Sequence, residues 1–257
     1  MLPSASNESL LRHTGSSLRN RIEPEIRINR CSDCRYRNAC VPRNVAARDL
    51  DLLSALSPTP RRVAHETPLY QADDLFAGLY TVRSGSFKSV GISRAGDLKV
   101  TGFHLPGDIV GLEGIGHRRY HYSVVALEDS EVCRIAYDTL IECSRSVPGL
   151  QSGLLQSVSA DITRDHGLLL LLGAMSAEER VVAFLLNLSG RYAAIHYATD
   201  HFVLRMTRAD IGSYLGLSLE TVSRAFTHLA DEGMIAVDRR DVVLKDLAGM
   251  RARFDCW

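Results

Sequence analysis

The spacing of apolar positions changes along the chain, and each change predicts a different kind of structure. From Val63 to about Ala136, short apolar runs alternate with turn-forming residues. The runs are 79–82, 87–90, 99–103, 122–127 and 131–135, and the turns fall at 72–74, 83–85, 94–97 and 105–108. Short strands at such regular spacing are typical of an antiparallel sandwich or roll.

From Pro148 the apolar spacing becomes three and four residues, which predicts one long helix over 148–174. Its stripe consists of Leu155, Val158, Ile162, Leu169 and Leu172, with Asp165 in the same register. Pairing this seam with a twofold mate buries the leucines but brings two Asp165 carboxylates together, which costs stability. Packing of the stripe on the chain's own sheets is the alternative.

Two shorter helices with a sharp turn between them follow a further amphipathic helix at 177–188. Thr207 can cap the first helix, with Asp210 as its capping-box partner. Gly216 supplies the turn, and Ser218 can cap the second helix. Ile211 and Leu215 give the first helix one apolar face, and we expect Leu219, Val222, Phe226 and Leu229 of the second helix to face the core.

The outward positions early in the second helix carry side chains that can read DNA bases. They are Glu220, Thr221, Ser223 and Arg224. Arginine pairs with guanine, a carboxylate accepts a hydrogen bond from cytosine, and small groups contact the thymine methyl. An ordinary helical hairpin with a solvated polar face has the same spacing. After Gly233, two apolar runs around 238–241 predict a β-hairpin wing whose arginines can contact phosphate.

Composition limits how such DNA binding can work. The 257 residues include 30 basic and 30 acidic ones, and residues 201–257 contain eight of each, so no global field attracts nucleic acid or membrane. Affinity must come from local placement and from two copies on one duplex, which a dimer seam provides. No apolar run approaches membrane-spanning length and no secretory signal is present, so we expect a cytoplasmic protein with no membrane partner.

Thiols stay reduced in the cytoplasm, so the six cysteines indicate a metal or redox role. Cys31, Cys34 and Cys40 are three possible ligands on one short segment, here called the cysteine segment. The candidates for a fourth ligand are Cys133, Cys143 and Cys256. Such a set suits an iron–sulfur cluster and also zinc, and unligated surface thiols are the remaining alternative. We expect residues 1–30, which are polar and aperiodic, to form a flexible arm, and 45–56 to form a short helix.

Two other classes of function are disfavoured. Rolls that bind cyclic nucleotides hold the phosphate with a short helix containing Gly-Glu, followed by Arg-Ser or Arg-Ala. Tyr120 and His121 stand where that arginine-containing pair would fall, although Arg118 and Arg119 are near. No glycine-rich phosphate loop, nucleophile elbow or His-Glu-x-x-His motif is present, so we expect no enzyme.

The order of these parts resembles the CRP/FNR superfamily, and specifically its FNR branch of oxygen-responsive regulators. The matching stretches are 101–105, 168–172, 177–180, 206–217 and the base-reading motif 220–224. The resemblance implies an α+β fold with an N-terminal β-roll of the cyclic-nucleotide-binding, jelly-roll type. The implied domains are the cysteine segment and sensor roll over 31–147, a dimerisation helix over 148–174, a winged helix-turn-helix over 175–248 and a tail over 249–257.

The resemblance also implies residue roles. Cys31, Cys34, Cys40 and Cys133 match the ligands of a [4Fe-4S] cluster. Glu220, Ser223 and Arg224 match the residues that read the half-site TTGAT, and Thr207 and Arg208 complete the DNA-binding set. Ile162 and Asp165 match the dimer-switch positions, and Gly96 and Asp97 match a loop that contacts RNA polymerase.

The implied function is transcription regulation, including activation, in the anaerobic response. An intact cluster docks the cysteine segment at Cys133 and promotes a homodimer that binds palindromes of the type TTGAT-N4-ATCAA; oxygen destroys the cluster and reverses this. Arg35, Arg37 and Ala39 depart from the family pattern, and we expect the two charges to favour a reduced cluster and Ala39 to admit oxygen. The alternative is a zinc-dependent, redox-dependent or nucleotide-binding regulator of the same fold without an oxygen-labile cluster.

Overall fold

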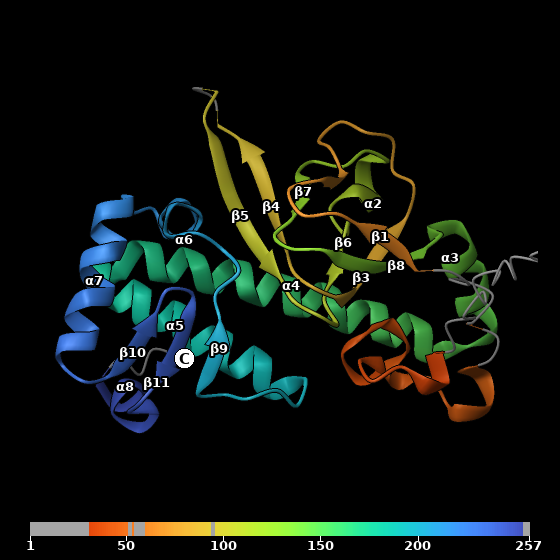
Figure 1. Cartoon of the computed structure of the whole chain (residues 1–257). Coiled ribbons are helices and arrows are strands. Elements are labelled where there is room, and N and C mark those ends of the chain that lie inside the picture. The colour runs from red at the N-terminus through yellow and green to blue at the C-terminus, as the bar shows by residue number, and fades with distance from the viewer. Residues whose placement is uncertain (1–30, 51–52, 54–59, 94–95, 254–257) are drawn as a thin grey trace, which may run out of the picture.

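The computed structural model of the protein describes residues 31–50, 53, 60–93 and 96–253 (Figure 1). The arm expected over 1–30, the end of the helix expected over 45–56, and Cys256 lie outside this range. The architecture is α+β: an N-terminal β-roll, one long helix and a C-terminal winged helix-turn-helix, as the sequence predicts.

The β-roll consists of two four-stranded antiparallel sheets, with orders β1-β8-β3-β6 and β2-β7-β4-β5. The strands are β1 Arg61–Val63, β2 Pro68–Tyr70, β3 Leu79–Ser84, β4 Phe87–Ile92, β5 Leu98–His104, β6 Ile109–Val110, β7 Ser123–Ala126 and β8 Ser130–Ile135. The five longest correspond to the five predicted runs. Val82, Phe87 and Val132 are fully buried in the roll, and α2 Gly114–His117 is a short helix at its side.

The cysteine segment precedes the roll as a series of 3-10 turns. These are η1 Cys31–Asp33, η2 Arg37–Ala39, η3 Val41–Asn44 and η4 Ala47–Asp49, followed by helical residues at Leu50 and Leu53. The apolar residues of this region pack with α3 Tyr137–Ser146 and with the start of α4 Pro148–Ala174. The long helix therefore begins directly beside the cysteine segment and runs on to the C-terminal domain (Figure 1).

Two glycines of α4 allow η3 to approach closely. A Cβ atom at Gly153 would lie 1.9 Å from the Val41 carbonyl oxygen, and one at Gly149 would lie 2.3 Å from the Asn44 oxygen. Both distances are far below any real contact, so a side chain at either position would push η3 away from the helix.

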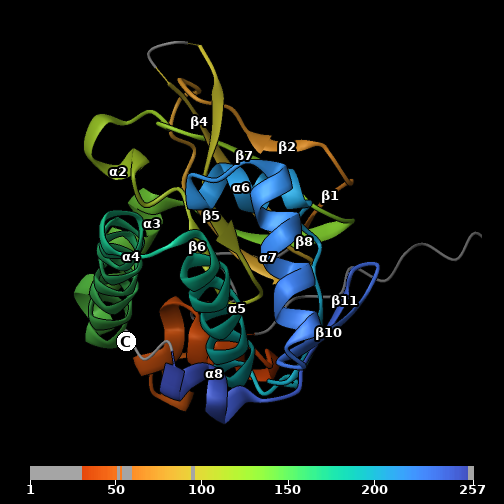
Figure 2. The same ribbon diagram turned by 90° about the vertical axis from the view of Figure 1, so that its left-hand side faces the viewer.

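The C-terminal domain is built around α5 Ala177–Ala194, which lies between α4 and α7 Leu219–Asp231 in Figure 2. Its other elements are β9 His201–Val203, α6 Arg208–Leu215, α7 Leu219–Asp231, β10 Ile235–Asp238, β11 Asp241–Leu244 and α8 Leu247–Arg253. Strands β10 and β11 form the predicted wing, and β9 adds the third strand.

The predicted helix caps are present in this domain. Thr207 and Asp210 form a capping box, Gly216 ends α6 with φ 65°, and the Ser218 side chain accepts from the Thr221 amide. The prediction that Leu219 faces the core is wrong: it is 47% exposed. Leu219 is the first residue of α7, directly after its cap, so it lies at the open end of the helix pair.

We expect Gly153→Ala to destabilise the protein by about 1–3 kcal/mol, the usual cost of overpacking. The added methyl must displace the Val41 carbonyl. Gly173→Ala is the matched control, because it lies in the same helix and a Cβ there meets nothing within 4 Å; it should be neutral or stabilise by about 0.5–1 kcal/mol. Thermal unfolding of the two variants tests this, and equal midpoints would contradict the close approach.

Candidate functional site

The three cysteines of the cysteine segment and Cys133 of β8 line one cavity. Cys31 starts η1, Cys34 follows it, and Cys40 separates η2 from η3. Most of the remaining wall is apolar and comes from Val41, Leu53, Val82, Ile135, Leu140 and Leu150. Cys143 packs against the adjoining core but does not line the cavity. The structure therefore selects Cys133 over Cys143 as the thiol that joins the other three.

Burial disfavours the charged form of the thiols in this cavity. Burial raises the pKa of Cys31 to about 11, and the nearby Cys133 and Cys34 add to the shift. Burial also raises the pKa of Cys40 to about 12, although a hydrogen bond of 3.3 Å to Thr81 lowers it in part. Metal ligation requires thiolates, so positive charge inside the cavity is what would hold these groups ionised.

Four thiols that face one cavity are a donor set that suits an iron–sulfur cluster and also zinc. Among the described residues, no three cysteine sulfurs come within 4.8 Å of one another.

The cysteine segment is tied to the long helix through Arg43. Its guanidinium donates to the carbonyl oxygens of Cys40 and Ala39, and also to the Ser157 hydroxyl of α4 at 2.9 Å. Ala39 in turn packs against the turn before β6, where a Cβ at Gly107 would lie 2.6 Å from the Ala39 Cβ. Movement of the Cys40 backbone would therefore change the hydrogen bond between Arg43 and Ser157.

The predicted dimer seam is open to solvent along most of α4. Leu155, Ile162 and Leu169 are 62%, 49% and 65% exposed, whereas Leu172 packs against the C-terminal core. The three exposed positions do not pack on the chain's own sheets. Asp165 lies among them, and burial together with the charge of Asp161 raises its pKa above the ordinary value.

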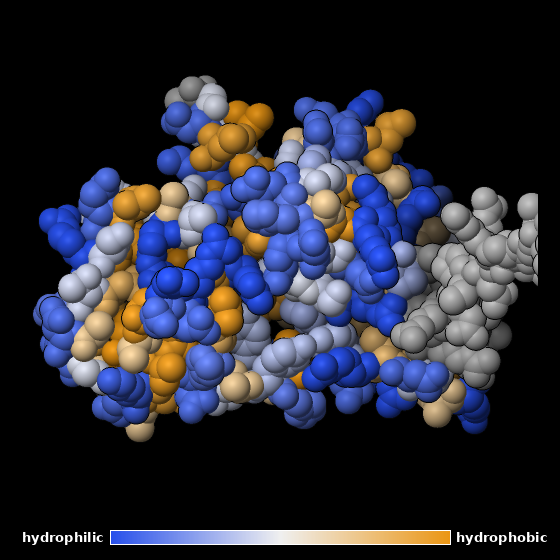
Figure 3. Space-filling model, viewed as in Figure 1, coloured by the Kyte–Doolittle hydropathy of each residue, from blue (hydrophilic) through white to orange (hydrophobic). Residues whose placement is uncertain are grey.

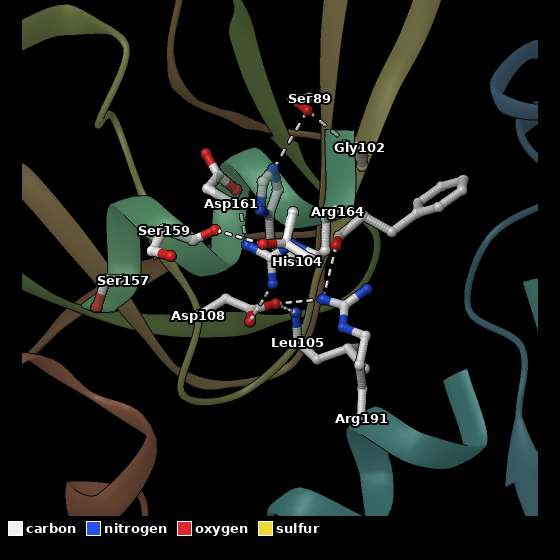
Figure 4. A network of polar contacts seen from close by, with 12 residues as sticks. Ser89, Gly102, His104, Leu105, Asp108, Ser157, Ser159, Asp161, Arg164 and Arg191 are labelled. Atoms are coloured by element: carbon white, nitrogen blue, oxygen red, sulfur yellow. Dashed lines mark hydrogen bonds and ion pairs between the residues drawn. The ribbon is translucent and has the colours of Figure 1, made fainter. Parts of the chain in front are cut away.

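A polar network joins the β-roll to both long helices (Figure 4). Asp108, in the turn before β6, accepts from Arg164 of α4 at 3.2 Å and from Arg191 of α5. Burial opposes ionisation of Asp108, but Arg191 and Arg164 outweigh it and hold its pKa below the usual value. His104 lies beside the network, and burial lowers its pKa to about 4, with the two guanidinium charges contributing.

The same region contains a cavity of about 390 Å³. Its two arginines, Arg164 and Arg191, are paired with Asp108. Tyr120, which stands where the phosphate-binding arginine of cyclic-nucleotide-binding relatives would fall, does not line this cavity. It is buried, stacks on Tyr70 with ring centroids 3.7 Å apart, and donates to the Gly78 oxygen. That side chain therefore offers no cation to a phosphate.

The expected DNA-reading side chains lie together on the outer face of α7. Glu220 and Arg224 are exposed, and Ser223 is half-buried. Hydrogen bonds from the helix N-terminus and from Ser218 hold the pKa of Glu220 below its usual value. Thr207 is committed to its cap, and the Arg208 guanidinium lies 3.4 Å over the Phe226 ring. Arg208 must leave this ring before it can contact a phosphate.

The wing and the β4–β5 hairpin complete the exposed features. Arg239 and Arg240 lie at the tip of the wing. Gly96 and Asp97 are exposed at the end of the β4–β5 hairpin, where Gly96 has φ 88°. Ile92 and Leu98, both 69% exposed, flank this loop, and Figure 3 shows apolar surface at the hairpin tip. Within the described residues, no helix is long and apolar enough to cross a membrane.

Sequence reasoning missed the contacts between the roll and the DNA-reading pair. Lys88 of β4 forms an ion pair of 2.5 Å with Asp210, the capping-box residue of α6. The Val100 amide of β5 donates to the Ser213 hydroxyl at 2.9 Å. No periodic pattern marks such pairs, because the partners lie more than a hundred residues apart.

Comparison with known families gives two matches within the chain. A cyclic nucleotide-binding domain matches residues 60–146, and a Crp-like helix-turn-helix domain matches residues 179–253. The solved structure of FixK2 from Bradyrhizobium japonicum superposes with a TM-score of 0.69 at 29% identity, over 76% of this chain and 96% of that chain.

Curated relatives span most of the chain. The transcriptional regulatory protein btr of Bordetella pertussis is 46% identical, over 86% of this chain and 91% of its own. The transcriptional activator protein anr of Pseudomonas aeruginosa is 38% identical, over 84% and 88%. The fumarate and nitrate reduction regulatory protein of Escherichia coli is 38% identical, over 84% and 86%.

We expect Asp108→Asn to lower the free energy of unfolding at pH 7 by about 3 kcal/mol, because it leaves two guanidinium groups without their carboxylate. The folded pKa of Asp108 is depressed. Its stabilisation is therefore complete above the unfolded value of 3.8 and is lost as the pH falls through the lower folded value. Urea unfolding at pH 7, 5 and 3.5 should show the difference from wild type shrinking only at the lowest pH.

Proposed function

Since this chain belongs to the CRP/FNR family of transcription regulators and to its FNR branch, we propose that it is a homodimeric, DNA-binding regulator of the anaerobic response that senses oxygen through a [4Fe-4S] cluster. The observation that carries the proposal is the convergence of Cys31, Cys34, Cys40 and Cys133 on one cavity. The name of one relative, the anaerobic regulatory protein of Haemophilus influenzae, supports the anaerobic assignment.

Cys31, Cys34 and Cys40 would hold the cluster from the cysteine segment, and Cys133 from the sheet. When bound, the cluster supplies an oxygen-labile crosslink between the two. The apolar wall of the cavity limits access of water to the thiolates, and Thr81 orients Cys40. Loss of the crosslink frees the segment from β8, leaving only its own contacts to hold it.

The chain's own residues pass this change to the dimer seam. Arg43 joins the backbone at Cys40 to Ser157 of α4, so a docked segment favours one position of the long helix. Leu155, Ile162 and Leu169 can then be buried against the partner subunit, while the two Asp165 carboxylates oppose the pairing. The helix is a two-state element that the docked segment biases toward the dimer.

The output of the dimer is recognition of a palindrome of the type TTGAT-N4-ATCAA. Glu220, Ser223 and Arg224 read each half-site in the major groove, and Thr207 and Arg208 approach the same duplex. The twofold axis of the seam sets the spacing of the two α7 helices. Gly96 and Asp97, exposed at the β4–β5 tip, present a surface to RNA polymerase at the promoter.

We expect Cys133→Ser to abolish the cluster and Cys143→Ser to retain it. Both substitutions remove one thiol from the same core region, but only Cys133 lines the cavity. The readouts are iron and sulfide content and visible absorbance of anaerobically purified protein, before and after air. A colourless wild-type protein that contains zinc would overturn the proposal in favour of the zinc alternative, and loss of the cluster in Cys143→Ser would contradict the ligand set.

We expect Asp165→Ala to dimerise and bind the palindrome in air, because it removes the repulsion across the seam. Glu142→Ala, which removes an exposed carboxyl from α3, is the charge-matched control and should behave like wild type. Sedimentation and DNA binding in air measure both effects, with a duplex altered in one half-site as the specificity control. A variant that stays monomeric would contradict the repulsion.

The raised pKa of Asp165 gives this switch a pH dependence. A second carboxylate across the seam raises the pKa further, so the dimer binds more protons than two monomers. Lowering the pH should therefore promote dimerisation of the cluster-free wild type, whereas Asp165→Ala should not respond. Sedimentation between pH 7.5 and 5.5 measures the difference.

A further inference from the structure

The cysteine segment contacts the DNA-binding domain directly, as well as through α4. The hydroxyl of Tyr36 lies 2.8 Å from that of Tyr197, which follows α5 and is 161 residues away in the chain. The guanidinium of Arg35 lies 5.3 Å from the Tyr36 ring centroid and 5.0 Å from the Tyr197 centroid. Arg35 is therefore placed over the two tyrosines, and the cavity with the thiols is lined by Arg37 and Arg83 but not by Arg35.

A second contact joins the same two regions. Gly107 lies between Ala39 of the segment and Ile195 at the end of α5. A Cβ atom at Gly107 would be 2.6 Å from the Ala39 Cβ and 3.8 Å from the Ile195 Cγ2. The small residue at 39, which departs from the family pattern, thus allows the segment to approach the turn that also contains Asp108, the partner of Arg191 on α5.

The position of Tyr36 makes its contact sensitive to the thiols. Tyr36 lies between Cys34 and Cys40, and its side chain is 7% exposed, whereas Tyr197 is 42% exposed. Tyr36 is therefore buried within the segment, and the more exposed Tyr197 meets it through the hydroxyl contact. A segment that leaves β8 would carry Tyr36 away and release Tyr197.

We propose that Arg35, Tyr36 and Tyr197 are positioning residues that transmit docking of the cysteine segment to the DNA-binding domain within one subunit, independently of dimerisation. The proposal rests on the proposed function, because it takes cluster binding as the signal that docks the segment. In the docked state the Tyr36–Tyr197 contact fixes the position of residues 192–203, which run from the end of α5 through β9. Helices α6 and α7 are the next helices along the chain. The dimer seam then sets the distance between two reader helices, and this contact sets the orientation of each one.

The contact is modest in strength, so it should tune DNA affinity and leave assembly unchanged. Loss of one hydrogen bond of ordinary net strength corresponds to a change of about five-fold in an equilibrium constant. Arg35 over the two rings adds a cation–π contribution of similar size at an exposed site. In the proposed function, dimerisation depends on the exposed seam of α4, and the contacts among these three side chains involve no residue of that helix.

The test uses the full chain with its cluster, prepared anaerobically, as wild type and four variants. Tyr36→Phe and Tyr197→Phe, singly and combined, remove only the hydroxyl contact. Tyr192→Phe is the matched control, because its ring lies beside Tyr197 at 6.1 Å and its hydroxyl is not the one that meets Tyr36. The measurements are cluster absorbance, dimer fraction, affinity for the palindromic duplex, and hydrogen exchange over 192–203 with and without the cluster.

We expect the two single variants to keep the absorbance and dimer fraction of wild type and to bind the duplex about five-fold more weakly. The double variant should be no weaker than either single one, because both remove the same contact. In wild type and Tyr192→Phe, the cluster should slow exchange over 192–203; in the other variants it should not.

Three results would overturn the inference. They are wild-type affinity in Tyr36→Phe and Tyr197→Phe, exchange over 192–203 that does not respond to the cluster in wild type, and loss of cluster absorbance in Tyr36→Phe, which would assign Tyr36 to cluster retention. A failure of the proposed function is distinct from all three, since it appears as a wild-type protein without air-labile absorbance.

Discussion

The close approach of the Val41 carbonyl to α4 at Gly153 is the constraint on which the rest of the site depends. With no side chain at 153, η3 lies directly on the helix. Cys40 is thereby brought to Thr81 of β3, and the cavity is closed between β8 and the segment. The same approach brings Arg43 within reach of Ser157. The placement of the Cys40 thiol and the contact of the segment with the long helix therefore depend on the same close approach.

The balanced composition of the chain is explained by how its charges are used. Asp108 binds two arginines from different helices, and Arg205 forms an ion pair with Glu128 across the same junction. Asp210 serves twice, since one carboxylate oxygen completes the α6 capping box and the other pairs with Lys88. The start of a reader helix is thus coupled to the β-roll by a single side chain. Lysine and arginine side chains that could otherwise attract nucleic acid instead form ion pairs between the β-roll and the helices.

Features set by neighbouring residues were predictable, and features set by distant ones were not. The Thr207 capping box, the turn at Gly216 and the extent of α4 each depend on a local pattern. Strands β1, β2 and β6 escaped prediction because two or three residues carry no periodicity. Spacing left Cys133, Cys143 and Cys256 equivalent, and only the family resemblance favoured Cys133. The contact of Arg35 with Tyr197 was not predictable, because its partner lies far along the chain.

The five consecutive leucines at 168–172 have a consequence for the single subunit. Leu169 and Leu170 are 65% and 60% exposed, and Leu155 and Ile162 of the same helix are 62% and 49% exposed. Apolar surface of this kind adheres to any exposed apolar patch, including that of a partly folded chain. Asp165 lies within the stripe, and a charge at such a place discourages unspecific association. The carboxylate that opposes pairing of the subunits in the proposed function thus has a second effect, since the same charge discourages aggregation of a single subunit.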